Sequence, residues 1–238
     1  MDIKIFIATD VRCGGTTFTS LFNTFSLKTI DDPQTRCFIK NEPMFNNYKT
    51  RKNRTNLLLD YCYNNLNFNV IKCSYISFSC DEYNQLLDYC NINNIIIIVL
   101  HRENIYKRSL SLELARNNLG WDVFENKNHK TVYINPKIYL NNIMTYNKKI
   151  KNCINYLNSN KKEYFFIVFE DFITSEKLCF SLYNKLKLVL SNKKWFKELK
   201  NKDYQTDKKL QFVANLKEIT NLNKNVSKPV LNIKSIEL

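Results

Sequence analysis

The chain has 238 residues, of which 44% are hydrophobic and 13% aromatic, so it is long enough to bury a sizeable core. Its formal net charge of +14 favours anionic partners, such as phosphorylated small molecules, polyanions or anionic membranes. The eight cysteines form no C-x-x-C pair and the chain has only two histidines, which argues against a zinc site and for buried, reduced thiols.

Short β-branched segments alternate with helical patterns along the chain. Strands are expected at residues 3–8, 69–73, 94–100 and 164–169, and helices at residues 16–27, 56–66, 81–90, 103–117, 137–157 and 176–190. Asp81 is expected as an N-cap, and Pro136 stands just before the longest helix, where proline is favoured. The alternation predicts an α/β protein with a central parallel sheet of about four to five strands flanked by helices.

The chain shows no internal repeat and no low-complexity linker, so residues 1–238 are expected to form one domain. The lysine-rich segment from about residue 192 is expected to lie at its periphery. The longest apolar run, residues 95–100, is too short to cross a membrane, and Asp2 and Lys4 interrupt the run that follows Met1. We therefore expect a soluble, cytoplasmic protein.

Two of the three glycines in the chain, Gly14 and Gly15, stand between the first predicted strand and the first predicted helix. This order is typical of a phosphate-binding loop, because glycines let backbone N–H groups approach an anion and the helix N-terminus adds partial positive charge. Thr16 and Thr17 would donate hydroxyl hydrogen bonds, and Arg12 would add a full charge. The alternative is an ordinary tight turn, but the scarcity of glycine elsewhere favours the anion site.

The loop differs from a nucleoside-triphosphate P-loop, which needs the pattern G-x-x-x-x-G-K-S/T. The chain has neither the earlier glycine nor the lysine, and its cation, Arg12, precedes the glycines. These differences argue against ATP hydrolysis and for a ligand that needs no metal.

A second candidate motif follows the apolar run at residues 94–100, where the strand tips of an open α/β sheet bind ligands. Arg102 lies at the expected strand tip, and Arg108, Ser109 and Ser111 lie one to two turns into the next helix. An arginine with a serine hydroxyl can hold a second phosphate. The alternative for each residue is a capped strand or a solvated helix face.

Together these segments, RCGGTTF at residues 12–18 and LHRENIYKRSLSLELA at residues 100–115, resemble two motifs of the sulfotransferases that use 3′-phosphoadenosine 5′-phosphosulfate (PAPS). The motifs are the 5′-phosphosulfate loop and the 3′-phosphate motif, and the similarity is greatest to the carbohydrate-sulfating group that includes nodulation-factor and trehalose sulfotransferases. NEPMF, VIKCSY and FIVFEDF follow in the expected order, at residues 41–45, 70–75 and 166–172. The resemblance covers roughly the first three-quarters of the chain and implies a three-layer P-loop-like fold.

The resemblance also implies roles for individual residues. Arg102 and Ser111 would hold the 3′-phosphate, and a basic C-terminal residue such as Lys209 would close over the adenosine. Glu42 would act as general base and take the proton of the acceptor hydroxyl; otherwise it is a surface acid before Pro43. The residues that would hold the 5′-phosphosulfate are Arg12, Cys13, Gly14, Gly15, Thr16 and Thr17.

Three further residues are a departure from the family pattern or have an alternative role. Gly15 stands where the family usually has serine or threonine, so one hydroxyl donor is missing. Lys72 is expected either to neutralise the sulfuryl oxygens or to extend its ammonium group from a strand end into solvent. Asp171, in the FEDF segment, is expected as an N-cap or a loop anchor.

The implied reaction is a metal-independent, in-line transfer of the sulfuryl group from PAPS to a hydroxyl of a carbohydrate or another small acceptor, with Arg12 and Glu42 as the catalytic residues. One alternative is a small-molecule kinase of the P-loop class. The other, suggested by the net charge, is a non-catalytic nucleic-acid-binding protein on the same fold. The basic residues show no regular interleaving with aromatic residues and no known reader motif, so no nucleic-acid partner is expected.

Overall fold

The computed structural model describes residues 3–33, 55–119, 131–188 and 213–238. Its centre is a five-stranded sheet in the order β2-β3-β1-β4-β5, and all strand pairs are parallel. The strands are β1 (Ile5–Thr9), β2 (Thr29–Asp31), β3 (Val70–Ser74), β4 (Ile96–His101) and β5 (Phe165–Val168). The predicted parallel sheet is confirmed.

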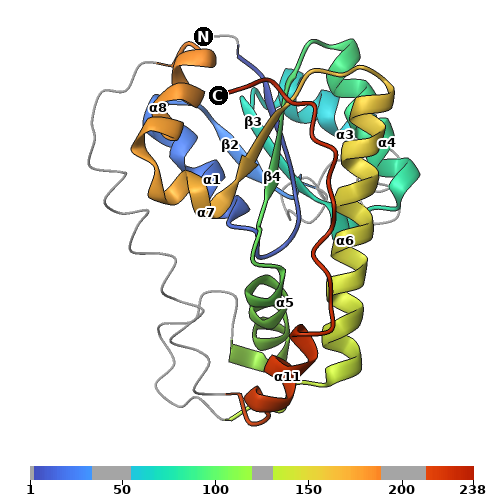
Figure 1. Ribbon diagram of the computed structural model, residues 1–238. Coiled ribbons are helices and arrows are strands. Elements are labelled where there is room, and N and C mark those ends of the chain that lie inside the picture. The colour runs from blue at the N-terminus through green and yellow to red at the C-terminus, as the bar shows by residue number, and fades with distance from the viewer. Residues whose placement is uncertain (1–2, 34–54, 120–130, 189–212) are drawn as a thin grey trace.

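Helices cover both faces of the sheet, so the fold has the three layers expected of a P-loop-like α/β protein (Figure 1). The first layer contains α1 (Gly15–Leu21), α7 (Phe169–Thr174) and α8 (Glu176–Lys185). The second contains α3 (Thr55–Asp60), α4 (Cys80–Ile92) and α6 (Pro136–Ser159). Helix α5 (Ile105–Leu114) continues beyond the carboxyl end of β4, and α11 (Leu216–Asn223) packs against α6.

The two faces of each strand pack into different cores, because successive side chains of a strand point to opposite sides. On β1, Ile5 and Ile7 pack against the α1 and α8 layer, whereas Phe6 and Ala8 pack against the α4 and α6 layer. All four are fully buried. This burial on both faces explains why the central strands read as continuous apolar runs.

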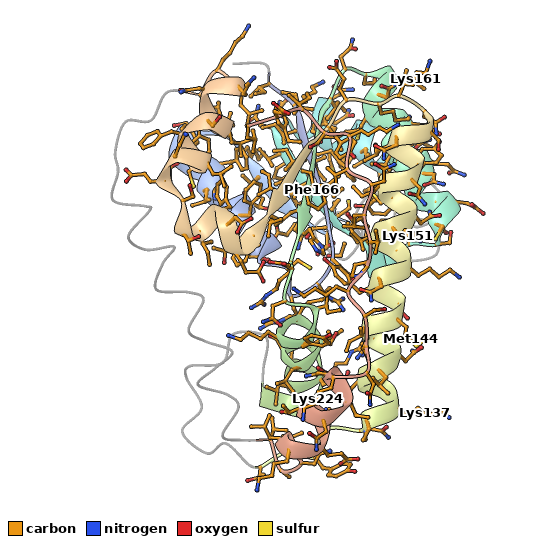
Figure 2. The ribbon with its side chains drawn as sticks, in the orientation of Figure 1. Lys137, Met144, Lys151, Lys161, Phe166 and Lys224 are labelled. Atoms are coloured by element: carbon orange, nitrogen blue, oxygen red, sulfur yellow. The ribbon has the colours of Figure 1, made fainter. Side chains whose placement is uncertain are left out.

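Helix α6 shows how a polar sequence can still form one wall of the core. Its residues Lys137, Met144 and Lys151 are exposed and lie in a line along the outer face (Figure 2). Tyr139, on the opposite face, is fully buried. The helix begins at Pro136, one residue earlier than predicted, and Asn135 is the N-cap.

Several predicted element ends were wrong, and each has a local cause. Helix α4 begins at Cys80 because Ser79 and Glu82 form a reciprocal capping box, so Asp81 lies in the first turn and is not the N-cap. Asp171 is also not an N-cap: it lies in the first turn of α7, whose N-cap is Val168.

Other elements were not predicted or have different lengths. The helix expected to end at residue 27 becomes a 3-10 turn, η1 (Phe22–Phe25), and stops at Ser26, which has φ 59°. Strand β2 has three residues and helix α7 has six, so neither is long enough to show a clear sequence period.

The described part of the C-terminal segment packs back onto the domain. Ile219 of α11 is buried in the same core as α6. The chain then runs along α6 towards β5, where the Ile236 N–H donates to the Tyr164 carbonyl at 2.9 Å (Figure 1). Within the four described ranges, no helix combines the length and apolar character needed to cross a membrane.

Candidate anion-binding site

The loop after β1 is tightly folded at the carboxyl edge of the sheet. Asp10 shapes it: one carboxylate oxygen accepts a hydrogen bond from the Val11 N–H at 2.8 Å, and its carbonyl accepts one from the Cys13 N–H at 3.3 Å. Arg12 and Gly14 both have left-handed backbone conformations, with φ of 63° and 76°. Two such residues reverse the chain within a few positions and direct it into α1.

Gly14 is required by both its backbone and its surroundings. A Cβ atom at this position would lie 2.2 Å from the ring of Phe169, at the start of α7. The ring therefore packs against the bare backbone of the loop. Any side chain here would meet this contact in addition to the strain of a positive φ.

Gly15 has a different close neighbour, the side chain of Lys72. A Cβ atom at Gly15 would lie 2.8 Å from Cδ of Lys72 and 3.0 Å from Cγ2 of Thr9. The alkyl chain of Lys72 occupies the space that a serine or threonine would need. The residue that the sequence leaves unexplained is therefore matched to Lys72, on the neighbouring strand β3.

Lys72 is held inside the protein by two carboxylates. It is only 6% exposed, and its ammonium nitrogen lies 2.8 Å from Asp32 and 3.5 Å from Asp31. Burial works against the charge of Lys72, but these two carboxylates outweigh it and raise the pKa. Lys72 is therefore a charged residue in a buried ion pair. The expectation that its ammonium group extends into solvent was wrong.

The structure brings the two sequence motifs together. The Arg12 Nε donates to the Ser111 hydroxyl at 2.9 Å, across 99 positions of sequence. The Arg102 Nη1 donates to the carbonyl of Arg12 at 3.0 Å, across 90 positions. Arg12, Arg102 and Ser111 thus form one connected group at the tips of β1 and β4.

Glu170, in the first turn of α7, holds the tip of β4. Its carboxylate accepts hydrogen bonds from the backbone N–H groups of Glu103, at 3.0 Å, and Asn104, at 3.2 Å. It also lies 3.4 Å from Nε of Arg102. The FEDF segment therefore anchors the site, as the sequence suggests, but through Glu170 and not through Asp171.

Arg108 has a structural role that sequence reasoning missed. Its side chain is 1% exposed, and its Nη2 donates to a carboxylate oxygen of Asp10, itself 2% exposed, at 2.6 Å. Its Nε donates to the Val11 carbonyl at 3.2 Å. The sequence-based expectation that Arg108 grips a phosphate was wrong, because this guanidinium is committed to holding the loop.

The other predicted site residues differ in accessibility. Thr16 is exposed and Thr17 is half-buried in the first turn of α1, where Gly14, as N-cap, offers no side chain. Cys13 is fully buried, and burial raises the pKa of its thiol. Glu42 and Lys209 lie outside the described residues, as does the whole NEPMF segment. Among the residues the structure describes, no three His, Cys, Asp or Glu side chains are grouped as a metal site.

His101, at the end of β4, is neutral because burial lowers its pKa from 6.5 to about 4. The unfolded chain takes up a proton near pH 6.5 and the folded protein does not. The folded state should therefore lose stability, on the order of 3 kcal/mol, as the pH falls from 6.5 towards 4.

This prediction is checked by urea unfolding of the wild type and of His101→Gln across that pH range. The stability of the wild type should fall more steeply with falling pH. The carboxylates lower the stability of both proteins equally, but only the wild type contains His101. Equal slopes for the two proteins would show that His101 is not held neutral.

No model of a known protein family matches the chain, and no curated protein matches it significantly. The function is therefore argued from the geometry of the site and from the motifs that it brings together.

Proposed function

We propose that this protein is a sulfotransferase that moves the sulfuryl group of PAPS to a hydroxyl of a carbohydrate or another small acceptor. One observation carries the proposal: Arg12, Arg102 and Ser111 come from two separate motifs and are joined by hydrogen bonds at the carboxyl edge of the sheet. In open α/β sheets this edge, at the point where strand order reverses, is where ligands bind. Here β1 lies at that point, between β3 and β4.

The charges of the site suit a ligand with two separate anionic groups. Arg12 is half-buried and lies beside the first turn of α1, where a 5′-phosphosulfate would accept hydrogen bonds from backbone N–H groups. Ser111 and Arg102 lie on the β4 side, where a 3′-phosphate would be held. PAPS supplies the sulfuryl group when bound. Arg12 and the loop would stabilise the negative charge left on its phosphate.

The remaining roles in the proposal belong to residues outside the described ranges. Glu42 would accept the proton of the acceptor hydroxyl, which must leave as the oxygen attacks sulfur. Lys209 would close over the adenosine. Both assignments rest on the motif resemblance. A cytoplasmic location and a saccharide acceptor belong to the same proposal.

Replacing Arg102 by alanine tests the proposal at its most specific residue. Loss of a charge-assisted hydrogen bond to phosphate should weaken the binding of adenosine 3′,5′-bisphosphate roughly 10- to 150-fold, measured by isothermal titration calorimetry. Arg102→Lys should restore part of the affinity, because it keeps the charge but not the planar group.

Arg116→Ala is the matched control, because Arg116 lies beyond α5 and forms an ion pair with Glu113 at 3.0 Å. It should leave bisphosphate affinity unchanged. If Arg102→Ala binds the bisphosphate as tightly as Arg116→Ala does, Arg102 does not hold the 3′-phosphate. Turnover of ATP in the presence of Mg²⁺ by the wild type would instead indicate a kinase.

A further inference from the structure

Tyr146, on α6, is bonded to both anion-binding motifs although it belongs to neither. It is fully buried, and its hydroxyl lies 2.6 Å from Nδ1 of His101 and 3.2 Å from the backbone nitrogen of Arg102. The same oxygen lies 3.6 Å from Sγ of Cys13, in the loop after β1. A single hydroxyl therefore connects the β4 tip with the β1 loop.

The ring of Tyr146 makes a second connection between the same parts. It lies parallel to the His101 ring, with an interplanar angle of 2° and centroids 5.7 Å apart. The guanidinium carbon of Arg108 lies 4.4 Å from the Tyr146 centroid. Since Arg108 donates to Asp10 and to the Val11 carbonyl, the ring supports the residue that shapes the loop.

The donors and acceptors around the hydroxyl form a consistent set. The Arg102 backbone N–H can only donate, so the Tyr146 oxygen accepts from it. The hydroxyl proton is then available to Nδ1 of the neutral His101 ring, and this arrangement requires the proton of His101 to be on Nε2. The Cys13 thiol can donate to the second lone pair of the oxygen. Burial raises the pKa of Tyr146 well above its ordinary value, so the hydroxyl keeps its proton.

We propose that Tyr146 is a positioning residue that couples the two anion-binding motifs and sets the backbone of Arg102 relative to the loop at Arg12. The proposal rests on the function proposed above only for the identity of the ligand that the two motifs bind. Without the hydroxyl, the buried Arg102 N–H and the His101 ring nitrogen each lose a partner, and buried polar groups without a partner are costly. Both segments should then open more readily.

Tyr146→Phe is the test, because it keeps the ring and removes only the hydroxyl. Tyr139→Phe is the matched control on the same helix: Tyr139 is also fully buried, and its hydroxyl donates to Asn223 at 2.8 Å, in the C-terminal segment. Hydrogen exchange of the protein without ligand is followed for residues 10–15 and 101–104, and binding of adenosine 3′,5′-bisphosphate is measured by calorimetry.

In Tyr146→Phe, exchange should become about tenfold faster in both segments and bisphosphate affinity should fall about tenfold. Tyr139→Phe should change neither the exchange rates of these segments nor the bisphosphate affinity, although the two variants should have similar midpoints of urea unfolding. If exchange speeds up in only one segment, or equally in both variants, the coupling is wrong. If the wild type binds no bisphosphate, the proposed function fails, and the exchange measurement still decides the coupling.

Discussion

Replacing Arg108 by alanine is expected to lower the free energy of unfolding by about 3–5 kcal/mol. The substitution removes the guanidinium that forms an ion pair with the Asp10 carboxylate, which is only 2% exposed. It also removes the donor to the Val11 carbonyl and the charge over the Tyr146 ring. Urea unfolding followed by circular dichroism measures the change.

Two further variants separate the cause from general damage. Lys228→Ala breaks an ion pair with Glu103 at 3.1 Å in which both side chains are more than half exposed, so it should cost less than about 1 kcal/mol. Arg108→Met combined with Asp10→Asn removes both charges, and should recover part of the stability lost in Arg108→Ala. An Arg108→Ala protein as stable as Lys228→Ala would contradict the assigned role of the buried pair.

Gly14→Ala is expected to cost about 2–5 kcal/mol, the sum of a left-handed backbone and an overpacked contact. The φ of 76° is unfavourable for alanine, and the new methyl would lie 2.2 Å from the Phe169 ring. Because the loop must move to relieve the contact, bisphosphate binding should also weaken. Urea unfolding and calorimetry on the same samples check both effects.

Gly15→Ala is the natural comparison, because its φ is not in the left-handed region and its nearest neighbour is a methylene of Lys72. The new methyl would overpack the ion-paired Lys72 side chain but would add no left-handed backbone strain, so this change should cost about 1–3 kcal/mol, less than Gly14→Ala. Combining Gly14→Ala with Phe169→Leu should relieve the contact and leave the backbone strain. Equal costs for the two glycine variants would contradict the difference between their surroundings.

The layers and the parallel sheet could be predicted from sequence because the strong signals are local. The central strands β1 and β4 begin with continuous apolar runs, IFIA and IIIVL, and α6 has a clear helical period. The elements that were missed are short. Strand β2 contributes only Ile30 to a core, and α7 begins directly after β5 with no turn residue between them.

The candidate site was predictable in part, for a different reason. Glycines beside an arginine, and an arginine at a strand tip, are visible in sequence because each is a local pattern. The pairing of Asp10 with Arg108, 98 positions apart, and the place of Tyr146 between the motifs depend on how α5 and α6 pack. No local pattern in the sequence indicates the pairing of Asp10 with Arg108 or the position of Tyr146.

Gly15 shows a residue whose place in the loop could not be explained from sequence alone. In the structure it makes room for Lys72 of β3, whose ammonium group binds Asp31 and Asp32 at the end of β2. The loop and the two strands are thus packed as one unit.

The central claim is most directly tested by thermal unfolding of the wild-type protein with adenosine 3′,5′-bisphosphate and, for comparison, adenosine 5′-monophosphate, without added divalent metal. We expect the bisphosphate to raise the melting temperature, with stabilisation of about 2.7 kcal/mol at 100 times the dissociation constant. The monophosphate, which lacks the group assigned to Arg102 and Ser111, should stabilise much less. No stabilisation by the bisphosphate at millimolar concentration, or equal stabilisation by both nucleotides, would contradict the account.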